Sequence, residues 1–205
     1  MPATLERENL TENEILQSAP RPFLWDGEMY LRASEAGFFG ERKVELIGGE
    51  IVEMSPHSKP HIVCANKVFE ILREIFPREY RIVGQSTYHA NERSKPEPDI
   101  AVFHASWNDL LGETPLVPVL ICEVSRDTLA YDRTRKASLY ASLGVPDYWI
   151  LNLIDDRIEV LRTPRAMSDQ PFGFGYGSTT IFTREETVSP LEISGVQIAV
   201  SELLP

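Results

Sequence analysis

The run "LVPVLICEV", residues 116–124, constrains the fold most, because it is almost wholly apolar and interrupted by one charged residue, Glu123. Such a run is typical of a central strand buried on both faces of a sheet. Helical spacing follows over residues 127–144, and two further strands are predicted over 146–154 and 157–162. The order strand–helix–strand, with several strands before it, predicts an α/β or α+β fold.

The residues before this unit predict five further elements. Gly48 and Gly49 supply the two-residue turn that a hairpin favours. Pro60 suits the first turn of an amphipathic helix. The predicted elements are a short helix at 26–37, a hairpin at 43–56, a helix at 60–76, and strands at 80–90 and 99–103.

The end of the chain is less regular. Gly, Pro and Ser are frequent between 163 and 180, where we expect a long loop, and short strands are expected over 178–205. The length of 205 residues suits one domain with a real core. We therefore predict a flexible arm over residues 1–22 and a single domain over 23–205.

Composition limits the classes of protein to which this chain can belong. The formal net charge is −11, which argues against a surface built to grip nucleic acid generally. No apolar run approaches the roughly 20 residues that cross a bilayer, and the polar N-terminus does not resemble a secretory signal. Cys64 and Cys122 lie in apolar surroundings without metal-binding spacing, as buried thiols in a reducing compartment do. We expect a cytoplasmic protein with no membrane partner.

Two carboxylates stand at strand positions. Asp99 opens the strand at 99–103, and Glu123 interrupts the apolar run, where an ionised carboxylate is costly unless it is paired or bound to metal. Consecutive strands are often neighbours, so the two groups can converge at one end of a sheet. With a backbone carbonyl they would form an oxygen site of the kind that Mg²⁺ accepts. The alternatives are a turn residue for Asp99 and a solvated edge position for Glu123.

The helix after Glu123 adds a basic group. In "DRTRKASLY", Lys136 lies one turn after Asp132 and four residues before Tyr140. A lysine that reaches back toward Glu123 can orient an attacking water or neutralise charge in a transition state. A solvated surface lysine is the alternative.

Three stretches together resemble a known family: "VELIGGEIVEMSP", "PEPDIAVF" and "LICEVSRDTLAYDRTRKASLYASLGVPDYWIL". Over roughly residues 22–162 the chain resembles the Uma2 family, also called DUF820, of restriction-endonuclease-like proteins. That family is placed in the PD-(D/E)xK nuclease superfamily. The resemblance implies a restriction-endonuclease-like mixed central sheet flanked by helices, with an added N-terminal hairpin and added C-terminal strands.

The superfamily motif maps onto this chain with one departure. Pro98 and Asp99 match the "PD" element, and Glu123 matches the "(D/E)" element. The superfamily lysine would stand two residues after the glutamate, at Ser125, so Lys136 is the candidate replacement. A turn or capping role just before the helix is favoured for Ser125 over a nucleophilic one.

Two earlier residues match the family as well. Glu45 matches an early glutamate, which implies a further metal-facing carboxylate, and His61 matches a helix-borne histidine. His57 lies four residues before His61, but Pro60 predicts that the helix begins between them, which disfavours zinc ligation. His61 is then either an accessory group near the carboxylates or a structural histidine.

The resemblance implies a Mg²⁺- or Mn²⁺-dependent endonuclease that hydrolyses phosphodiester bonds in DNA. It implies a homodimer, and binding to DNA through a local basic face would be weak and salt-sensitive. The residues implied are the metal ligands Asp99 and Glu123, the further catalytic groups Lys136 and Glu45, and the phosphate contacts Arg126, Arg133 and Arg135.

A second hypothesis belongs to another class. The chain would then be a binding or regulatory protein that keeps the nuclease fold without its chemistry. The serine at position 125 and the net charge of −11 favour this hypothesis, whereas the joint presence of Asp99, Glu123 and Lys136 disfavours it.

Overall fold

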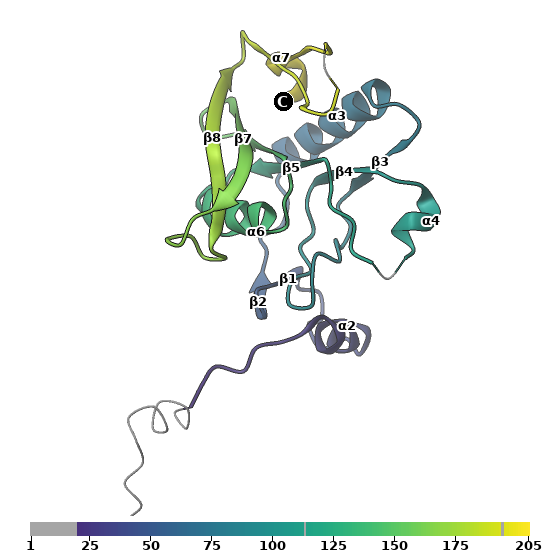
Figure 1. Ribbon diagram of the computed structural model, residues 1–205, viewed down its shortest axis with the longest axis vertical. Coiled ribbons are helices and arrows are strands. Elements are labelled where there is room, and N and C mark those ends of the chain that lie inside the picture. The colour runs from purple at the N-terminus through teal and green to yellow at the C-terminus, as the bar shows by residue number, and fades with distance from the viewer. Residues whose placement is uncertain (1–19, 113, 194) are drawn as a thin grey trace, which may run out of the picture.

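A six-stranded sheet forms the centre of the computed structural model, which describes residues 20–112, 114–193 and 195–205 (Figure 1). The strand order is β3-β4-β5-β6-β7-β8. β5 and β6 are parallel, and the other neighbouring pairs are antiparallel, so the predicted mixed sheet is confirmed. The strands are β3 Tyr80–Gly84, β4 Ile100–His104, β5 Leu120–Ser125, β6 Asp147–Asn152, β7 Arg157–Ala166 and β8 Phe174–Thr183.

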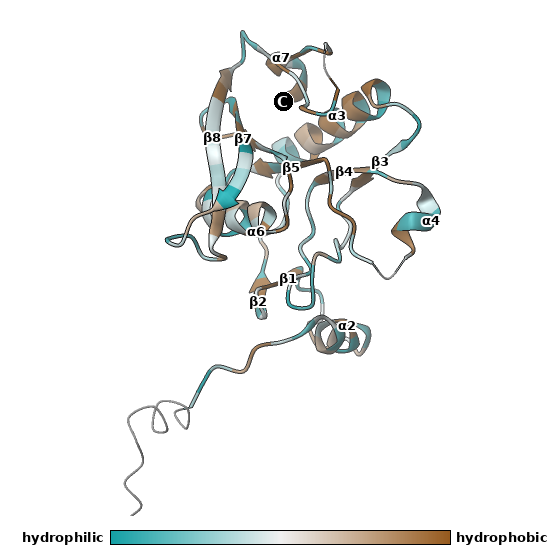
Figure 2. Cartoon of the chain, viewed as in Figure 1, coloured by the Kyte–Doolittle hydropathy of each residue, from teal (hydrophilic) through white to brown (hydrophobic). Residues whose placement is uncertain are grey.

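Helices cover both faces of this sheet. α3 (Lys59–Ile75) and α7 (Val200–Leu203) pack on one face, and α6 (Ala137–Ser142) packs on the other. Figure 2 shows hydrophobic colouring along β4, β5 and much of α3. In β5, Cys122 and Val124 face the α3 side, while Ile121 faces the α6 side. Because side chains alternate along a strand, Glu123 projects toward the α6 side.

The hairpin is confirmed as β1 (Val44–Ile47) paired with β2 (Glu50–Glu53). Gly48 and Gly49 form its turn with φ of +63° and +84°, a conformation that glycine adopts without strain. The Lys95 amide donates to the Leu46 carbonyl at 2.7 Å. This bond fixes the hairpin against the segment that leads to Asp99, and it thereby brings Glu45 close to the end of the sheet.

Smaller elements complete the architecture. α2 begins where predicted, because the Asp26 side chain accepts a hydrogen bond from the Met29 amide at 2.8 Å. The added C-terminal strands are confirmed as a short antiparallel pair. These elements are α2 Gly27–Glu35, α4 Trp107–Leu110, β9 Thr187–Val188 and β10 Ile198–Ala199.

The helix predicted over 127–144 is interrupted. It comprises α5 (Leu129–Tyr131), a π-helical turn η1 (Asp132–Lys136) and α6. Such turns insert a residue into the α-helical register and often occur at functional sites. Here both ends of η1, Asp132 and Lys136, are buried against the sheet.

Two other predictions were wrong in extent. The strand expected over 80–90 ends at Gly84, because Gln85 takes a φ of +45° that breaks the extended backbone. The loop expected over 163–180 is mostly strand, since β7 continues to Ala166 and β8 begins at Phe174. Gly175 belongs to β8, where an added Cβ would lie 2.8 Å from Met167 Sδ. Glycine at this position leaves room for the Met167 side chain, which lies just past the end of β7.

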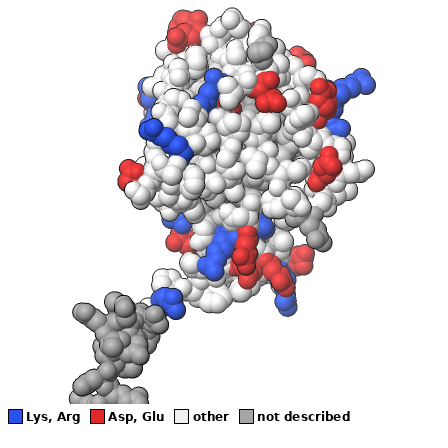
Figure 3. Space-filling model, viewed as in Figure 1, with Lys and Arg blue, Asp and Glu red and all other residues white. Residues whose placement is uncertain are grey.

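The surface carries charges of both signs. On the face shown in Figure 3, Lys and Arg lie scattered among Asp and Glu, and both signs gather at the lower end near α2. Among the described residues, no helix combines the length and apolar character needed to cross a bilayer. Both cysteines are buried and free, as predicted. The predicted arm lies almost wholly outside the described residues, of which only 20–22 belong to it.

Candidate active site

Asp99 and Glu123 meet at one end of the sheet. β4 and β5 are antiparallel with Ile100 opposite Cys122, so the next positions outward bring the two acidic residues side by side. Asp99 Oδ2 accepts from the Val124 amide at 2.9 Å, and Glu123 Oε2 accepts from the Asp99 amide at 3.3 Å. Both side chains are buried and line one cavity. The predicted convergence of the two carboxylates is therefore present.

Lys136 reaches the same cavity from η1. Its Nζ lies 3.0 Å from Glu123 Oε1 and 3.3 Å from Glu45 Oε1. The Tyr140 hydroxyl also donates to Glu123 Oε1, at 2.7 Å. Lys136 and Tyr140 stand four residues apart on the sheet-facing side of the helix, which explains why both reach one carboxylate. The helix after β5 thus places a lysine ammonium beside Glu123, while position 125 carries a serine.

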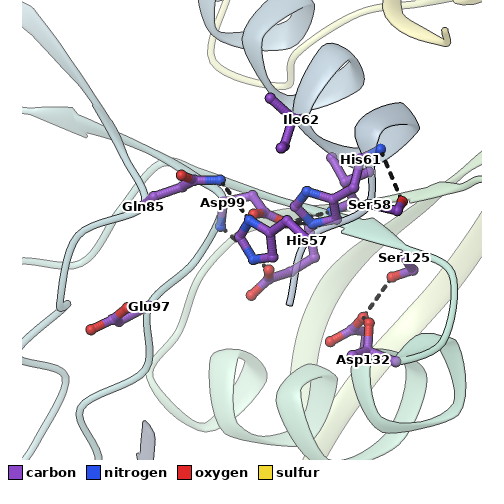
Figure 4. A network of polar contacts seen from close by, with 12 residues as sticks. His57, Ser58, His61, Ile62, Gln85, Glu97, Asp99, Ser125 and Asp132 are labelled. Carbon is purple, nitrogen blue, oxygen red and sulfur yellow. Dashed lines mark hydrogen bonds and ion pairs between the residues drawn. The ribbon is translucent and has the colours of Figure 1, made fainter. Parts of the chain in front are cut away.

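Ser125 has a different environment. Its hydroxyl donates to Asp132 Oδ2 at 2.6 Å, and the Thr128 hydroxyl donates to the same oxygen at 2.6 Å. The Tyr148 hydroxyl donates to the Asp132 carbonyl at 3.1 Å. Figure 4 shows Ser125 directed at Asp132. These bonds anchor the π-helical turn to the end of β5, and so they hold Lys136 in place.

The buried charges do not balance. Burial raises the pKa of Glu123 to about 8, against the opposing effect of Lys136, and burial also raises the pKa of Glu45. Burial lowers the pKa of Lys136, but Glu123 and Glu45 outweigh it and hold this pKa well above its usual value. Burial raises the pKa of Asp99, but His61, the Val124 amide and Lys136 together outweigh burial, and the net shift is downward. Asp99, Glu123 and Glu45 share one lysine ammonium, so ionisation of Glu123 leaves negative charge that a cation would neutralise.

Two histidines approach Asp99 from the other side. His61 Nε2 lies 3.1 Å from Asp99 Oδ2, and the His57 and His61 rings stack with centroids 4.0 Å apart (Figure 4). Lys43 Nζ and Gln85 Nε2 each lie 3.2 Å from a His57 ring nitrogen. α3 does begin between the histidines, at Lys59, yet the rings meet. The structure places His61 beside the Asp99 carboxylate, and its role there stays a prediction.

The cavity has the features of a cation site. Glu45 Oε2 is buried and has no hydrogen-bond partner among the described residues. The cavity offers about 50 Å³, and a single water needs at least about 10–15 Å³ of such space. Carboxylate oxygens of Asp99, Glu123 and Glu45 are hard donors suited to a divalent ion with water as further ligands. The side chains present therefore fit the metal that the sequence predicted.

The three arginines predicted to contact phosphate differ in position. Arg126 is exposed and lines the cavity. Arg133 Nε donates to Glu159 Oε2 at 2.8 Å, and Arg135 Nη2 donates to Glu50 Oε2 at 2.6 Å. Arg126 therefore has the position best suited to a substrate, and the phosphate contacts of the other two stay predictions.

Sequence reasoning missed several contacts at this site. The sequence pattern assigned no role at the site to Tyr140 or to Asp132. The regular spacing of Asp132, Lys136 and Tyr140 carried the signal, because residues four apart share a helix face. Lys43 and Gln85 gave no such signal, since they reach His57 through loop and strand ends distant in sequence.

Comparison with known proteins agrees with this architecture. The Uma2 family model, described as "Putative restriction endonuclease", matches residues 28–201. The chain therefore belongs to the Uma2 family, whose nuclease class implies a divalent metal. A crystal structure from Anabaena variabilis, described as "a putative nuclease belonging to DUF820", is 16% identical with a TM-score of 0.56. The match covers 95% of this chain and 97% of that one, and it shows a shared fold. None of the curated proteins compared matches the chain.

Proposed function

We propose that the protein is a metal-dependent endonuclease that hydrolyses phosphodiester bonds in DNA. The observation that carries this proposal is the cluster at the end of β4 and β5. There Asp99 and Glu123 line one cavity with Lys136 Nζ at 3.0 Å from Glu123 Oε1. Membership of the Uma2 family supports the nuclease class.

Asp99 and Glu123 would hold the cation, Mg²⁺ or Mn²⁺, and Glu45 would add its free oxygen or bind through water. When bound, a divalent ion lowers the pKa of a coordinated water and stabilises charge on the scissile phosphate. The Val124 amide fixes one Asp99 oxygen by its hydrogen bond at 2.9 Å. The Tyr140 hydroxyl fixes Glu123, so the ligand positions are organised before substrate arrives.

Lys136 would serve the role of the motif lysine. Its ammonium is buried between Glu123 and Glu45, which holds it protonated and directed at the cavity. A fixed positive charge beside the attacked phosphate stabilises the negative charge that develops in the transition state. Lys136 would therefore neutralise charge rather than accept a proton.

Substrate contact would be local. Arg126 at the rim is the candidate phosphate contact, and mixed surface charge around it supports weak binding that salt weakens further. The proposal includes a homodimer and a cytoplasmic location, which follow from the family resemblance and the composition. Sedimentation of the purified chain with and without DNA tests the assembly.

Cleavage of plasmid DNA at low salt with Mg²⁺ or Mn²⁺ tests the activity. The wild type is compared with Glu123→Gln, which preserves size and removes the charge. The metal and its ligands contribute several kcal/mol to such reactions, so the variant should lose at least about 100-fold in rate. Glu202→Gln is the matched control, because Glu202 is an exposed carboxylate on α7 outside the site.

Three other results would reject the proposal. Equal cleavage by wild type and Glu123→Gln would place the activity elsewhere. A folded wild type that binds the cation but cleaves no DNA would favour the regulatory hypothesis. Turnover of nucleotides without cleavage of plasmid or single-stranded DNA would indicate a hydrolase of small phosphoesters.

A further inference from the structure

The two histidines form a second set of metal-ligand groups with Asp99. His57 precedes α3 and His61 lies in its first turn, so both rings stand at the mouth of the cavity. One ring nitrogen from each and one Asp99 oxygen lie within 4.8 Å of one another. Ligand atoms that share an ion at bonds of about 2.0–2.2 Å lie roughly 3–4.4 Å apart. Small side-chain shifts would therefore bring all three atoms onto one ion.

We propose that His57, His61 and Asp99 bind a divalent transition-metal ion, at a position beside the oxygen site of Glu123. Asp99 would be common to the two positions. Glu123 and Glu45 do not belong to the group of atoms within 4.8 Å, so the histidine site is a separate position. It stands on these three side chains and does not depend on the chemistry proposed for Glu123.

His61 has one ring nitrogen without a partner among the described residues. Its Nε2 faces Asp99 at 3.1 Å, but its Nδ1 is buried and without a partner in the part of the chain that the structure describes. A neutral imidazole has one N–H group and one lone pair, and the protein engages only one of these nitrogens. Buried polar atoms are rarely left this way, so the ring has unused binding capacity.

The donor set selects the kind of ion. Two imidazole nitrogens and one carboxylate are typical ligands of Mn²⁺, Co²⁺, Zn²⁺ and Fe²⁺, whereas Mg²⁺ and Ca²⁺ prefer oxygen alone. Three protein ligands leave positions open for water or a phosphate oxygen. The histidine site is therefore expected to prefer Mn²⁺ over Mg²⁺, while the carboxylate site accepts both.

Lys43 opposes this ion in the metal-free protein. Its ammonium lies 3.2 Å from His57 Nε2 and 3.9 Å from Glu97 Oε2. An ion at His57 would repel Lys43, which is partly exposed and can turn toward Glu97. Removing the ammonium with Lys43→Met should therefore tighten Mn²⁺ binding, an effect opposite in sign to that of His57→Ala.

The experiment uses the full chain with Mn²⁺ as the probe. Calorimetry gives the affinity, and pulsed electron paramagnetic resonance detects ¹⁴N nuclei bonded directly to Mn²⁺. We expect a nitrogen signal in the wild type and Mn²⁺ binding at least about 10-fold tighter than Mg²⁺ binding. His57→Ala should weaken Mn²⁺ binding by more than about 10-fold, because even outer-shell partners contribute that much. His104→Ala is the matched control, since His104 is exposed at the end of β4.

Two results would overturn the inference. One is a wild type whose bound Mn²⁺ shows no nitrogen coupling. The other is a His57→Ala protein, shown by circular dichroism to be folded, that binds Mn²⁺ like the wild type; His57→Gln repeats this measurement if the alanine variant does not fold. Either result leaves the ion among the carboxylates and leaves the proposed nuclease intact. A nitrogen signal that persists in Glu123→Gln supports the separate site, whether or not the wild type cleaves DNA.

Discussion

Two buried carboxylates on neighbouring parallel strands show how the same group serves different ends. Asp147 begins β6 and Glu123 lies near the end of β5, so they stand at opposite ends of the sheet. Both are almost inaccessible to solvent. They differ in what surrounds them, and this difference separates a structural ion pair from a site that is prepared for a ligand.

The Asp147 end is closed. Arg162 Nε and Nη2 donate to the two carboxylate oxygens at 2.8 and 3.1 Å. The Trp149 indole and the Leu191 amide donate to the same group at 2.9 and 2.8 Å. One carboxylate, one guanidinium and two further donors leave no oxygen unpaired, which is the condition under which a buried charge is tolerated.

The Glu123 end is open. Lys136 is shared between Glu123 and Glu45, and Glu45 Oε2 lacks a partner beside the cavity in the described structure. The missing element is positive charge, which a cation supplies and a side chain does not. An excess of buried carboxylate over cationic groups therefore distinguishes the Glu123 end of this sheet from the Asp147 end.

Replacing Asp147, the carboxylate at the closed end of the sheet, should give the largest loss of stability. Asp147→Asn removes the charge that Arg162 neutralises and places an amide N–H against a donor. Breaking a buried pair costs about 3–5 kcal/mol, and because the Arg162 side chain is 29% exposed we expect about 3 kcal/mol. Urea unfolding measures the change, with Glu192→Gln as a surface control. A loss below about 1 kcal/mol would remove the contrast between the two ends.

The corresponding change at the open end, Glu123→Gln, should raise the stability of the metal-free protein instead of lowering it. Folded Glu123 has its pKa raised to about 8 by burial, above the value near 4.3 of an unfolded glutamate. The folded state then holds a proton that the unfolded state has lost, so wild-type stability falls as pH rises from about 4.5 to about 8. Glu123→Gln removes this dependence and should therefore be more stable than metal-free wild type at pH 8.

Unfolding with urea at several pH values in the presence of a chelator checks this sign. The difference between the proteins should vanish near pH 4, where both states of the wild type are protonated. A Glu123→Gln protein that is less stable than wild type at pH 8 would mean that Lys136 and Tyr140 already satisfy the carboxylate.

Much of the fold could be predicted from local pattern. The apolar run around Glu123, the Gly48-Gly49 turn and the capping Asp26 each determine structure through neighbours in sequence. The extent of β8 could not be predicted, because Gly175 is a strand residue only through its pairing with Arg165 of β7. The π-helical turn also escaped prediction, since its register depends on Asp132 bonding to Ser125 at the end of β5.

The candidate site divides in the same way. Asp99 and Glu123 could be identified from their local positions in the sequence. Asp99 opens a predicted strand, and Glu123 interrupts an apolar run. The meeting of His57 and His61 could not be predicted, because the sequence shows only that a helix begins between them. Ring stacking across a helix start depends on the backbone path before α3, which no spacing rule records.

Adding a cation should neutralise the excess negative charge at the Glu123 end of the sheet and leave the Asp147 end unchanged. Binding to the folded state stabilises it by about 1.4 kcal/mol when free Mg²⁺ is tenfold above its dissociation constant. We expect this upward shift in melting temperature for wild type and for Asp147→Asn, whose lesion lies at the other end. Asp99→Asn and Glu123→Gln should lose the shift. A shift that persists in both of these variants would locate the bound Mg²⁺ outside the carboxylate cluster.

Asp132 provides an intermediate case and the smallest expected effect. Like Asp147 it is buried, but its hydrogen bonds come from the Ser125 and Thr128 hydroxyls, both to Oδ2, instead of from a guanidinium. Ser125→Ala removes one of these donors and leaves the other, so the free energy of unfolding should fall by about 1 kcal/mol. The Mg²⁺-induced shift in melting temperature should equal that of wild type, because Ser125 anchors η1 and does not contact Glu123. Loss of that shift together with unchanged stability would show instead that the hydroxyl acts at the cation, and would move position 125 back into the site where the motif places its lysine.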